Sequence, residues 1–315
     1  MPEDPDDLDE IGEIPPEGDF LGLPAWLCRK EAARVEVVPA PYEAGVSYGG
    51  GAARGPAALI AASRQVELYD RGLGTEPVRR YGVHTGPALA FAPDEPPASV
   101  LGRLAERTAA AAAAGRFPLV LGGDHSLSPG AFAGIALARP GDAFDIVHLD
   151  AHADLRDRYG GSPHSHACAA RRLLEHPACG KIWQLGVRSL GAGEAAFLRS
   201  RPGRLRTWFA EDLSGDAWRR ELAEGLAGKR VYLTLDVDAF DPAVVPGTGT
   251  PEPDGLSWRL GLEIGELVAR AAERVVGMDV VEAAPVPGLH YSEFNVAKLL
   301  YLWLNRFIRL PPPGK

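Results

Sequence analysis

The stretch HLDAHADLRD, residues 148–157, places two aspartates and a histidine two positions apart. Residues two apart in an extended chain project from the same side, so Asp150, His152 and Asp154 would lie close together. One such group is weak evidence, because acidic residues often form turns and helix caps after strands. It indicates a ligand site only if other parts of the chain bring matching side chains to the same place.

In three further segments, a candidate ligand or catalytic residue also follows an apolar run. His125 follows an apolar run in FPLVLGGDHS, Asp236 and Asp238 follow one in VYLTLDVDAFDP, and Glu282 follows one in GMDVVEAAP. Turns and caps do not explain why histidines occur at two of these places. Polar side chains after four separate apolar runs therefore indicate one shared site.

Such a cluster needs a cation. Several unpaired anions in a partly dry crevice repel one another and shift one another's pKa values. Two histidines and four aspartates are too many ligands for one zinc ion with an open position, and an oxygen-rich set without thiolates suits two divalent ions of the manganese type. Paired metals of this kind share carboxylates and make a nucleophile from bound water near neutral pH. The pattern predicts a binuclear hydrolase.

The elements that must position these residues are buried strands. Longer helical segments separate the short β-branched runs, as in a parallel sheet covered by crossover helices. In such α/β sheets ligands bind in the crevice outside the carboxyl ends of the strands, which is where the polar residues fall. The predicted strands cover residues 35–38, 117–122, 144–150, 181–187, 230–238 and 274–282.

Composition limits the class of protein. A chain of 315 residues, 46% of them hydrophobic, can bury a large core without a partner. The net charge of −9 argues against a nucleic-acid partner. No run of about 18 apolar residues occurs, and the N-terminus resembles no secretory signal, so we expect no membrane partner and a cytoplasmic location. Cys28, Cys168 and Cys179 suit reduced thiols better than a disulfide framework.

The chain divides into two unequal parts. Residues 1–25 form an extension rich in Asp, Glu and Pro, which we expect to be disordered or loosely packed. Residues 26–315 contain no clear linker, and we expect them to form a single catalytic domain.

The motifs LGGDHS, DAHADLRD, LDVDAFDP and GMDVVEAAP, in this order and at these separations, resemble those of the ureohydrolase family of arginases, agmatinases and formimidoylglutamases. The resemblance extends over residues 39–304. It implies an α/β protein with a three-layer α/β/α arginase-type fold around a parallel sheet of about eight strands. It also implies two Mn²⁺ ions in a binuclear centre, a small cationic guanidino substrate, and a homo-oligomer that is a trimer or a hexamer.

The resemblance assigns the metal ligands. Asp150 and Asp236 would bridge the ions, His125 and Asp154 would complete one site, and His152 and Asp238 would complete the other. The implied metal-binding residues are His125, Asp150, His152, Asp154, Asp236 and Asp238.

The resemblance also implies three catalytic residues. Asp154 would orient a bridging hydroxide, and Glu282 would pair with the guanidinium group through two N–H donors. His166 falls where the family has a histidine that moves protons or hydrogen-bonds substrate. Many agmatinases read Ser-His-Gly at this point, whereas residues 165–167 read Ser-His-Ala, so His164 is a second candidate.

Four further features would support the site. We expect His148 to be a buried imidazole that supports a ligand, and Asp124 and Asp241 to shape loops or hold neighbouring residues. The Pro- and Gly-rich segment 248–258 is of the kind that walls an active site.

The substrate is less well defined by the sequence. The segment LRDRYGGSPHSHACAARR resembles the agmatinase branch, which favours agmatine hydrolysed to putrescine and urea. Guanidinobutyrate, other guanidino acids, arginine and formimidoylglutamate stay open. Arg158, Arg171 and Arg172 would either serve a substrate carboxylate or be surface charges.

Two other classes compete with this interpretation. A catalytically silent regulatory metalloprotein of the same fold would be expected to lose a ligand or Glu282, and all of these residues are present. A zinc-dependent amide deacetylase of related fold would need one metal and fewer aspartates.

Overall fold

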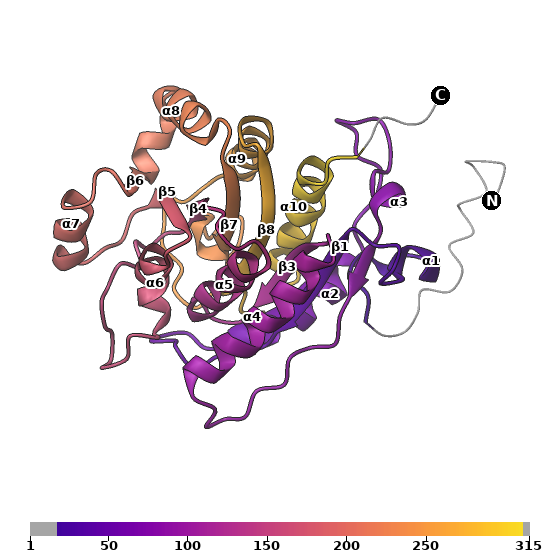
Figure 1. Cartoon of the computed structure of the whole chain (residues 1–315), viewed down its shortest axis with the longest axis horizontal. Helices are drawn as coiled ribbons and strands as arrows, with labels where there is room; N and C mark the ends of the chain where they lie inside the picture. Colours follow the sequence, from indigo (N-terminus) through magenta and orange to yellow (C-terminus); the bar gives the residue numbers. More distant parts are fainter. Residues whose placement is uncertain (1–17, 311–315) are drawn as a thin grey trace.

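Eight runs of mainly β-branched and apolar residues form one parallel sheet in the computed structural model, which describes residues 18–310 (Figure 1). Every strand pair in this sheet is parallel. The strands are β1 Val35–Ala40, β2 Val83–Thr85, β3 Phe117–Gly122, β4 Phe144–Leu149, β5 Cys179–Val187, β6 Leu205–Phe209, β7 Arg230–Asp236 and β8 Arg274–Val281.

Helices cover both faces of the sheet, because parallel strands need crossover connections. The α-helices are α1 Ala25–Cys28, α2 Gly55–Ser63, α3 Val78–Tyr81, α4 Pro97–Ala113, α5 Ser128–Ala138, α6 Ala169–Glu175, α7 Ala192–Arg199, α8 Ala217–Leu226, α9 Trp258–Ala271 and α10 Tyr291–Phe307. The short 3-10 helices are η1 Phe20–Gly22, η2 Ala52–Arg54, η3 His125–Leu127, η4 His166–Cys168, η5 Ala210–Ser214 and η6 Val237–Ala239. Within residues 18–310, none of these helices has the length and apolar character needed to cross a membrane.

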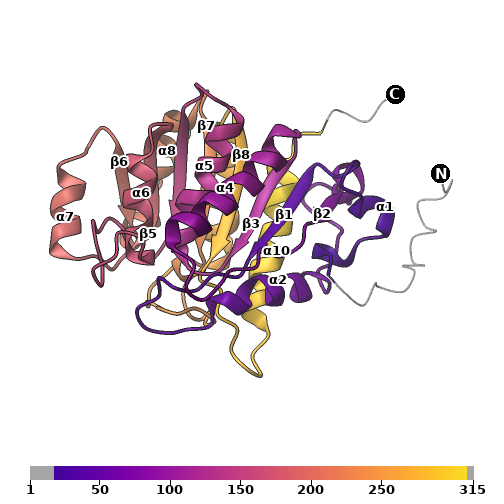
Figure 2. The same cartoon turned by 60° about the horizontal axis from the view of Figure 1, so that its bottom comes forward.

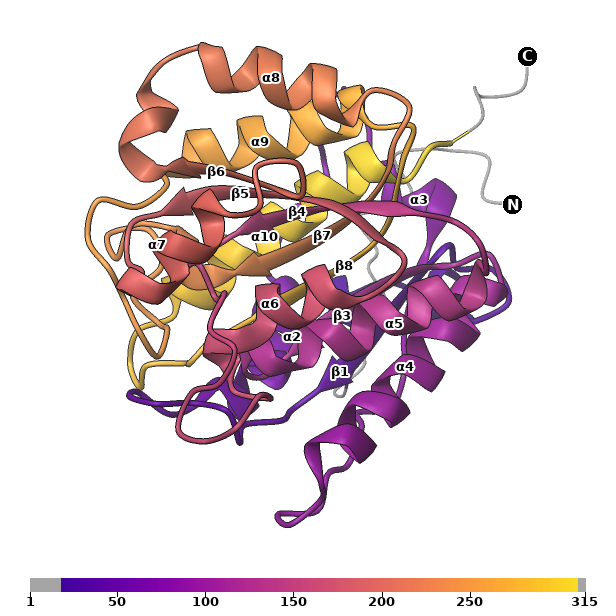
Figure 3. The ribbon, with the colours of Figure 1, turned by 60° about the vertical axis from the view of Figure 1, so that its left-hand side comes forward.

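The helices and the sheet form three layers. Helices α8, α9 and α10 pack on one face of the sheet, and α4, α5 and α6 pack on the other (Figure 3). Helix α2 packs against α10. Each face buries its own apolar cluster, one containing Leu149 and Leu235 and the other containing Ile146 and Tyr232. This confirms the predicted three-layer α/β/α fold around an eight-stranded parallel sheet.

The strand order explains why distant motifs meet. Across the sheet the order is β2-β1-β3-β8-β7-β4-β5-β6. The four strands that precede the predicted site residues, β3, β8, β7 and β4, are therefore consecutive neighbours. Loops from before α2 and from after β7 and β8 gather at one end of the strands (Figure 2), where the backbone N–H of Gly49 donates to the carbonyl of Gly249. The carboxyl ends of the central strands thus share one edge.

Two of the eight strands were not predicted from their own residues. Strand β2 has only three residues, and β6 reads LRTWF with a mixture of buried and partly exposed positions. Both are edge strands, with one side unpaired, so their residues need not form the continuous apolar run that marks a central strand. The six predicted strands include all the central ones.

The predicted N-terminal extension, residues 1–25, lies largely outside the described residues. Its last part differs from the loose packing that we expected, since Phe20, Leu21 and Leu23 are buried. The backbone N–H of Phe20 donates to the Thr85 hydroxyl (2.9 Å), and that of Leu21 donates to the Ser63 hydroxyl (2.7 Å). The apolar sequence FLGL, which begins at residue 20, accounts for this, because it can bury surface that the preceding acidic residues cannot. The packed chain therefore begins before residue 26.

Contact between α9 and α10 depends on a glycine. A Cβ atom added to Gly265 would overlap the indole ring of Trp303, which is buried. We expect Gly265→Ala to lower the stability of the protein by about 1–3 kcal/mol, because the side chain overpacks a closely filled contact. The matched control is Gly193→Ala in α7, where nothing lies within 4 Å of an added Cβ. This change should raise stability by about 0.5–1 kcal/mol through helix propensity. Thermal unfolding of both variants checks the pair, and equal effects would contradict the packing.

Candidate metal centre

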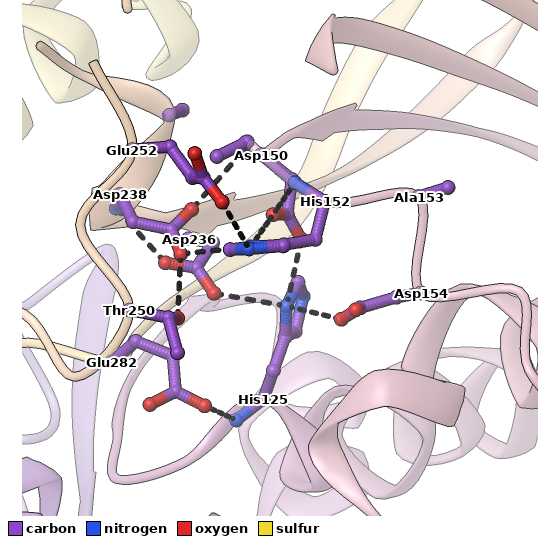
Figure 4. A network of polar contacts seen from close by, with 12 residues as sticks. His125, Asp150, His152, Ala153, Asp154, Asp236, Asp238, Thr250, Glu252 and Glu282 are labelled. Carbon is purple, nitrogen blue, oxygen red and sulfur yellow. Dashed lines mark hydrogen bonds and ion pairs between the residues drawn. The ribbon is translucent and has the colours of Figure 1, made fainter. Parts of the chain in front are cut away.

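The predicted ligands converge at the carboxyl edge of the central strands (Figure 4). His125 begins η3 directly after the turn that follows β3, and Asp150 follows the last residue of β4. Asp236 ends β7, Asp238 lies in η6, and Glu282 follows β8. His152 and Asp154 lie on the loop after β4. Strand order thus brings together residues that the sequence separates by more than a hundred positions.

One group of ligand atoms surrounds His125. Its Nδ1 lies 3.1 Å from Asp150 Oδ2, 3.1 Å from Asp154 Oδ2 and 3.3 Å from Asp236 Oδ2. All four side chains are buried. One nitrogen and three carboxylate oxygens, from residues that follow β3 and β4 or end β7, therefore face a common point.

A second group shares Asp150. His152 Nδ1 lies 3.1 Å from Asp238 Oδ2 and 3.5 Å from Asp150 Oδ1. Asp150 thus presents one oxygen to each group, as a bridging carboxylate would. Backbone N–H groups orient the carboxylates, since Asp150 Oδ1 accepts from His152 N (2.6 Å) and Asp236 Oδ1 accepts from Asp238 N (2.9 Å).

The charges of this cluster are strongly unbalanced. Burial raises the pKa of Asp236, and the nearby Asp238 and Asp150 raise it further, well above its ordinary value. Burial alone would lower the pKa of His125, but the facing carboxylates, Asp150 first, raise it well above its ordinary value. Burial would also lower the pKa of His152, but hydrogen bonds to Asp150 and Asp238 raise it to about 12. The buried carboxylates therefore need a compensating positive charge, which either protons on the imidazoles or metal ions can supply.

The hydrogen-bond geometry favours metal ions. Among the described residues, His125 Nδ1 and Asp150 Oδ2 are buried atoms without a correctly aligned hydrogen-bond partner, although they lie 3.1 Å apart. Buried polar atoms are nearly always paired. Atoms that approach one another without aligning are expected where all of them aim at a shared ion, and histidine and carboxylate ligands suit divalent metals. The residues present therefore fit a metal centre.

Backbone strain coincides with the site. Asp154 and Glu282 have φ angles of 50° and 63°, in the left-handed region that residues with a side chain seldom adopt. Such strain, about 1–3 kcal/mol for each residue, persists only where the surrounding structure enforces it, and it is concentrated at functional sites. Here it turns both carboxylates toward the cluster.

Glu282 and His166 form the wall beside the ligands. Glu282 Oε1 accepts a hydrogen bond from the backbone N–H of His125 (2.8 Å) and lies 3.4 Å from His166 Nδ1. His166 Nε2 lies 2.9 Å from the Ser47 hydroxyl. A cavity of about 280 Å³ opens here, lined by Asp154, Asp236 and His166 among others. A small molecule in this cavity would contact the ligand cluster directly.

Of the two candidate histidines, His166 lies in the cavity and beside Glu282. The backbone N–H of His164 donates to the Ser162 hydroxyl, and the His164 side chain does not line the cavity. The geometry therefore favours His166 for the catalytic role.

The candidate arginines lie outside the cavity, where Arg158 is exposed and Arg171 and Arg172 are partly buried. Arg171 and Arg172 pair with Glu175, and Arg172 also pairs with Asp157 (2.8 Å). Arg158 donates to the carbonyl of Gly161, and none of the three lines the cavity.

The supporting residues hold loops and ligands. Asp124 accepts hydrogen bonds from the backbone N–H groups of Ala44 and Gly45 (2.8 and 2.7 Å), which ties the loop before α2 to η3. Asp241 accepts from Ala243 N and Gly255 N. His148 Nε2 lies 2.9 Å from Asp150 Oδ2. The three cysteines are buried and unpaired thiols.

Two polar contacts of the site were not predicted. The Thr250 hydroxyl donates to Asp238 Oδ2 (3.1 Å), and Ser47 contacts His166. Thr250 lies within segment 248–258, which the sequence indicates only as a wall. Ser47 lies in a loop without a periodic pattern, so its side chain gives no signal before the fold brings it to His166.

A three-layer α/β/α fold with a histidine and carboxylate cluster at the carboxyl edge defines a class of metal-dependent hydrolases, and comparison with known proteins agrees. The model of the arginase family matches residues 33–303. An N(1)-aminopropylagmatine ureohydrolase from Synechocystis sp. is 36% identical over 273 residues, 85% of this chain and 87% of the relative. An agmatinase from Bacillus cereus is 33% identical over 261 residues, 81% and 85% of the two chains. The crystal structure of agmatine ureohydrolase from Thermoplasma volcanium has a TM-score of 0.75 at 28% identity and covers 88% of this chain and 91% of that one.

The chain therefore belongs to the arginase family, which confirms the resemblance seen in the sequence. It is a ureohydrolase-type enzyme, a hydrolase of guanidino C–N bonds. Its ligand cluster has the composition that a binuclear metal site requires.

The roles assigned to Asp150 and Glu282 predict different effects of removing each charge. Asp150→Asn should bring the bound Mn²⁺ per chain well below two, because a bridging ligand loses its charge. Glu282→Gln, the matched control, should retain both ions and lose turnover, because the family resemblance assigns Glu282 to the substrate and not to the ions. Equilibrium dialysis against MnCl₂ followed by metal analysis measures the difference. Equal metal loss in the two variants would contradict the assignment.

Proposed function

We propose that this chain uses two Mn²⁺ ions to hydrolyse agmatine to putrescine and urea. The observation that carries the proposal is the convergence of six ligand side chains on two adjacent points beside the buried carboxyl group of Glu282. His125 and Asp154 would hold one ion, His152 and Asp238 the other, and Asp150 and Asp236 both.

Manganese suits the ligand set, because four carboxylates and two imidazoles without a thiolate favour a hard divalent ion over zinc. When bound, two such ions lower the pKa of a water molecule and neutralise the charge that develops during hydrolysis.

Glu282 is the group placed for the substrate cation. The His125 N–H donates to one of its oxygens and so restricts the position of that oxygen before substrate binds. Burial raises the pKa of Glu282, while the adjacent His166 opposes this effect. A guanidinium group beside Glu282 would favour the ionised carboxylate and donate two N–H hydrogen bonds to it.

His166 is the proton carrier in this proposal. Burial would lower its pKa, but the hydrogen bond to Glu282 raises it. The ring contacts Ser47 at Nε2 and Glu282 at Nδ1, so it can hold a proton while turned toward the cavity. His166 would deliver this proton to the amine that leaves, and Asp154 would take a proton from the attacking water.

The outer part of the cavity favours an amine over a carboxylate at the far end of the substrate. Arg156 lines the cavity, but its Nε lies 3.4 Å from Glu194 Oε2 and its guanidinium stacks on the Tyr159 ring. This arginine is thus already engaged, which leaves a guanidino acid without an evident cation. Aminopropylagmatine is the second candidate substrate, because a relative named for that substrate is more similar to this chain (36% identity) than the agmatinase is (33%).

Two further features stay proposals. We propose a homo-oligomer, either a trimer or a hexamer, and a cytoplasmic location, both on the resemblance to the family and on the composition of the chain.

Urea release from the Mn²⁺-loaded chain tests the proposed activity. We expect kcat/KM for agmatine to exceed that for arginine and guanidinobutyrate by at least about tenfold, since a misplaced carboxylate would enter the cavity unpaired. Aminopropylagmatine, guanidinopropionate and formimidoylglutamate complete the panel. The metal-loaded Glu282→Gln protein is the control for contaminating activity. A preference for a guanidino acid would contradict the agmatine proposal, and silence on every compound would favour a regulatory metalloprotein.

A further inference from the structure

Five neighbouring strands carry polar side chains in one line across the sheet. In the strand register Asp279 of β8 pairs with Thr234 of β7, Thr234 with His148 of β4, His148 with Gln184 of β5, and Gln184 with Thr207 of β6. The first four of these side chains are completely buried. We call these five residues the polar row. It lies two residues before the bridging carboxylates, directly beneath the metal centre.

Buried polar groups are costly unless they are hydrogen-bonded, so the row needs an explanation. Apolar residues occupy the positions two residues earlier on β4 and β5, Ile146 and Ile182, and belong to the core on this face of the sheet. The change from apolar to polar therefore falls at the level of the metal centre. The hydrogen bonds of the row show what the change does.

On the β8 side of the row, Asp279 and Thr234 determine which nitrogen of His125 carries hydrogen. Asp279 accepts hydrogen bonds from the hydroxyls of Thr234 (2.6 Å), Ser128 (2.9 Å) and Tyr232 (2.5 Å). Since Thr234 gives its only proton to Asp279, its oxygen must accept from His125 Nε2, 3.0 Å away. Nε2 of His125 therefore carries hydrogen. Its Nδ1 is the nitrogen left to face the ligand carboxylates.

On the β6 side of the row, Thr207 and Gln184 determine which nitrogen of His148 carries hydrogen. The Gln184 amide nitrogen lies 2.8 Å from the carbonyl oxygen of Ala153, which can only accept, so the orientation of this amide is unambiguous. Its oxygen accepts from the Thr207 hydroxyl (2.8 Å). The same amide nitrogen lies 2.9 Å from His148 Nδ1, which must therefore accept its second hydrogen. The proton of the neutral His148 ring is then on Nε2.

This proton faces a bridging ligand. His148 Nε2 lies 2.9 Å from Asp150 Oδ2, within donor distance, although the N–H is not yet aligned with the oxygen. A nitrogen that carries hydrogen cannot bind a metal. His148 lies close enough to His125, Asp150 and Asp154 to share an ion with them. The tautomer assigns it the other role, that of a hydrogen-bond donor to Asp150.

We propose that the polar row fixes the imidazole tautomers of the metal centre, so that His125 offers a bare Nδ1 to the ions while His148 steadies Asp150 as a donor and binds no metal. The inference rests on the binuclear site of the proposed function. His148, Thr234, Gln184 and Asp279 are positioning residues. Removing a hydrogen bond of the row should weaken metal binding by about 10–100-fold, as loss of outer hydrogen-bonding partners typically does.

The test at His148 compares a variant that keeps a donor with one that does not. His148→Gln keeps an N–H near the position of Nε2, and His148→Phe keeps the ring shape without a donor. Equilibrium dialysis of the full chain against MnCl₂ gives stoichiometry and affinity without reference to substrate. We expect both variants to bind two ions at saturation, with affinity reduced about 10–100-fold in the Phe variant and largely restored in the Gln variant.

A second pair of variants, at Thr234, tests the inference even if the His148 variants misfold. Thr234→Ser keeps the hydroxyl that accepts from His125, and Thr234→Val removes it with little change in shape. The Val variant should lose affinity for Mn²⁺ by a similar factor, and the Ser variant should stay within a few-fold of the wild type. Ile146→Ala is the control for buried destabilisation on the same face of β4, and it should lower the thermal midpoint without changing Mn²⁺ affinity.

Two results would overturn the inference. If His148→Gln bound one ion at saturating MnCl₂, His148 would be a ligand. If the Phe and Val variants bound Mn²⁺ as the wild type does, the row would have only a structural role. A wild-type chain that bound fewer than two ions would instead remove the binuclear site of the proposed function, and the inference with it.

Discussion

Mutual repulsion among buried carboxylates is the constraint on which the rest of this structure depends. Asp150, Asp154, Asp236 and Asp238 are buried together around His125 and His152, and Asp154 and Asp236 reach the wall of the cavity. Burial of charges without compensation costs many kcal/mol, and the raised pKa of Asp236 reflects this cost. The arrangement is stable only with added positive charge. In the proposed function, two divalent ions would supply that charge beside the guanidino group that is hydrolysed.

The fold meets this constraint through the order of its strands. Strands β3, β8, β7 and β4 are consecutive in the sheet, so they deliver the six ligands and Glu282 to one edge without long excursions. The left-handed backbone at Asp154 and Glu282 turns their carboxyl groups toward the cluster. Beneath them, the polar row replaces apolar packing with directed hydrogen bonds, so His125 and His148 each meet the cluster in one tautomer. Stability is thus given up locally for precise geometry at the site.

The sequence predicts most of the site, because each ligand lies at or within five residues after the end of a central strand that reads as an apolar run. Edge strands β2 and β6 escape this signal, since their residues are only partly buried. The burial of Phe20 was missed because the acidic residues before it dominate the local composition. The contact between Ser47 and His166 joins loops far apart in the chain. Pairing of Thr234 with Asp279 and His148 depends on the register between β7 and its two neighbours, β8 and β4, and no local pattern records that register.

Anomalous X-ray diffraction at the manganese absorption edge, from crystals of the full chain grown with MnCl₂, tests the central claim most directly. The account predicts two peaks about 3.5–4 Å apart. One should lie beside His125 and Asp154, the other beside His152 and Asp238, and Asp150 and Asp236 should lie between them. A single peak, or ions bound away from these residues, would contradict the claim that the carboxylate cluster exists to hold two metals.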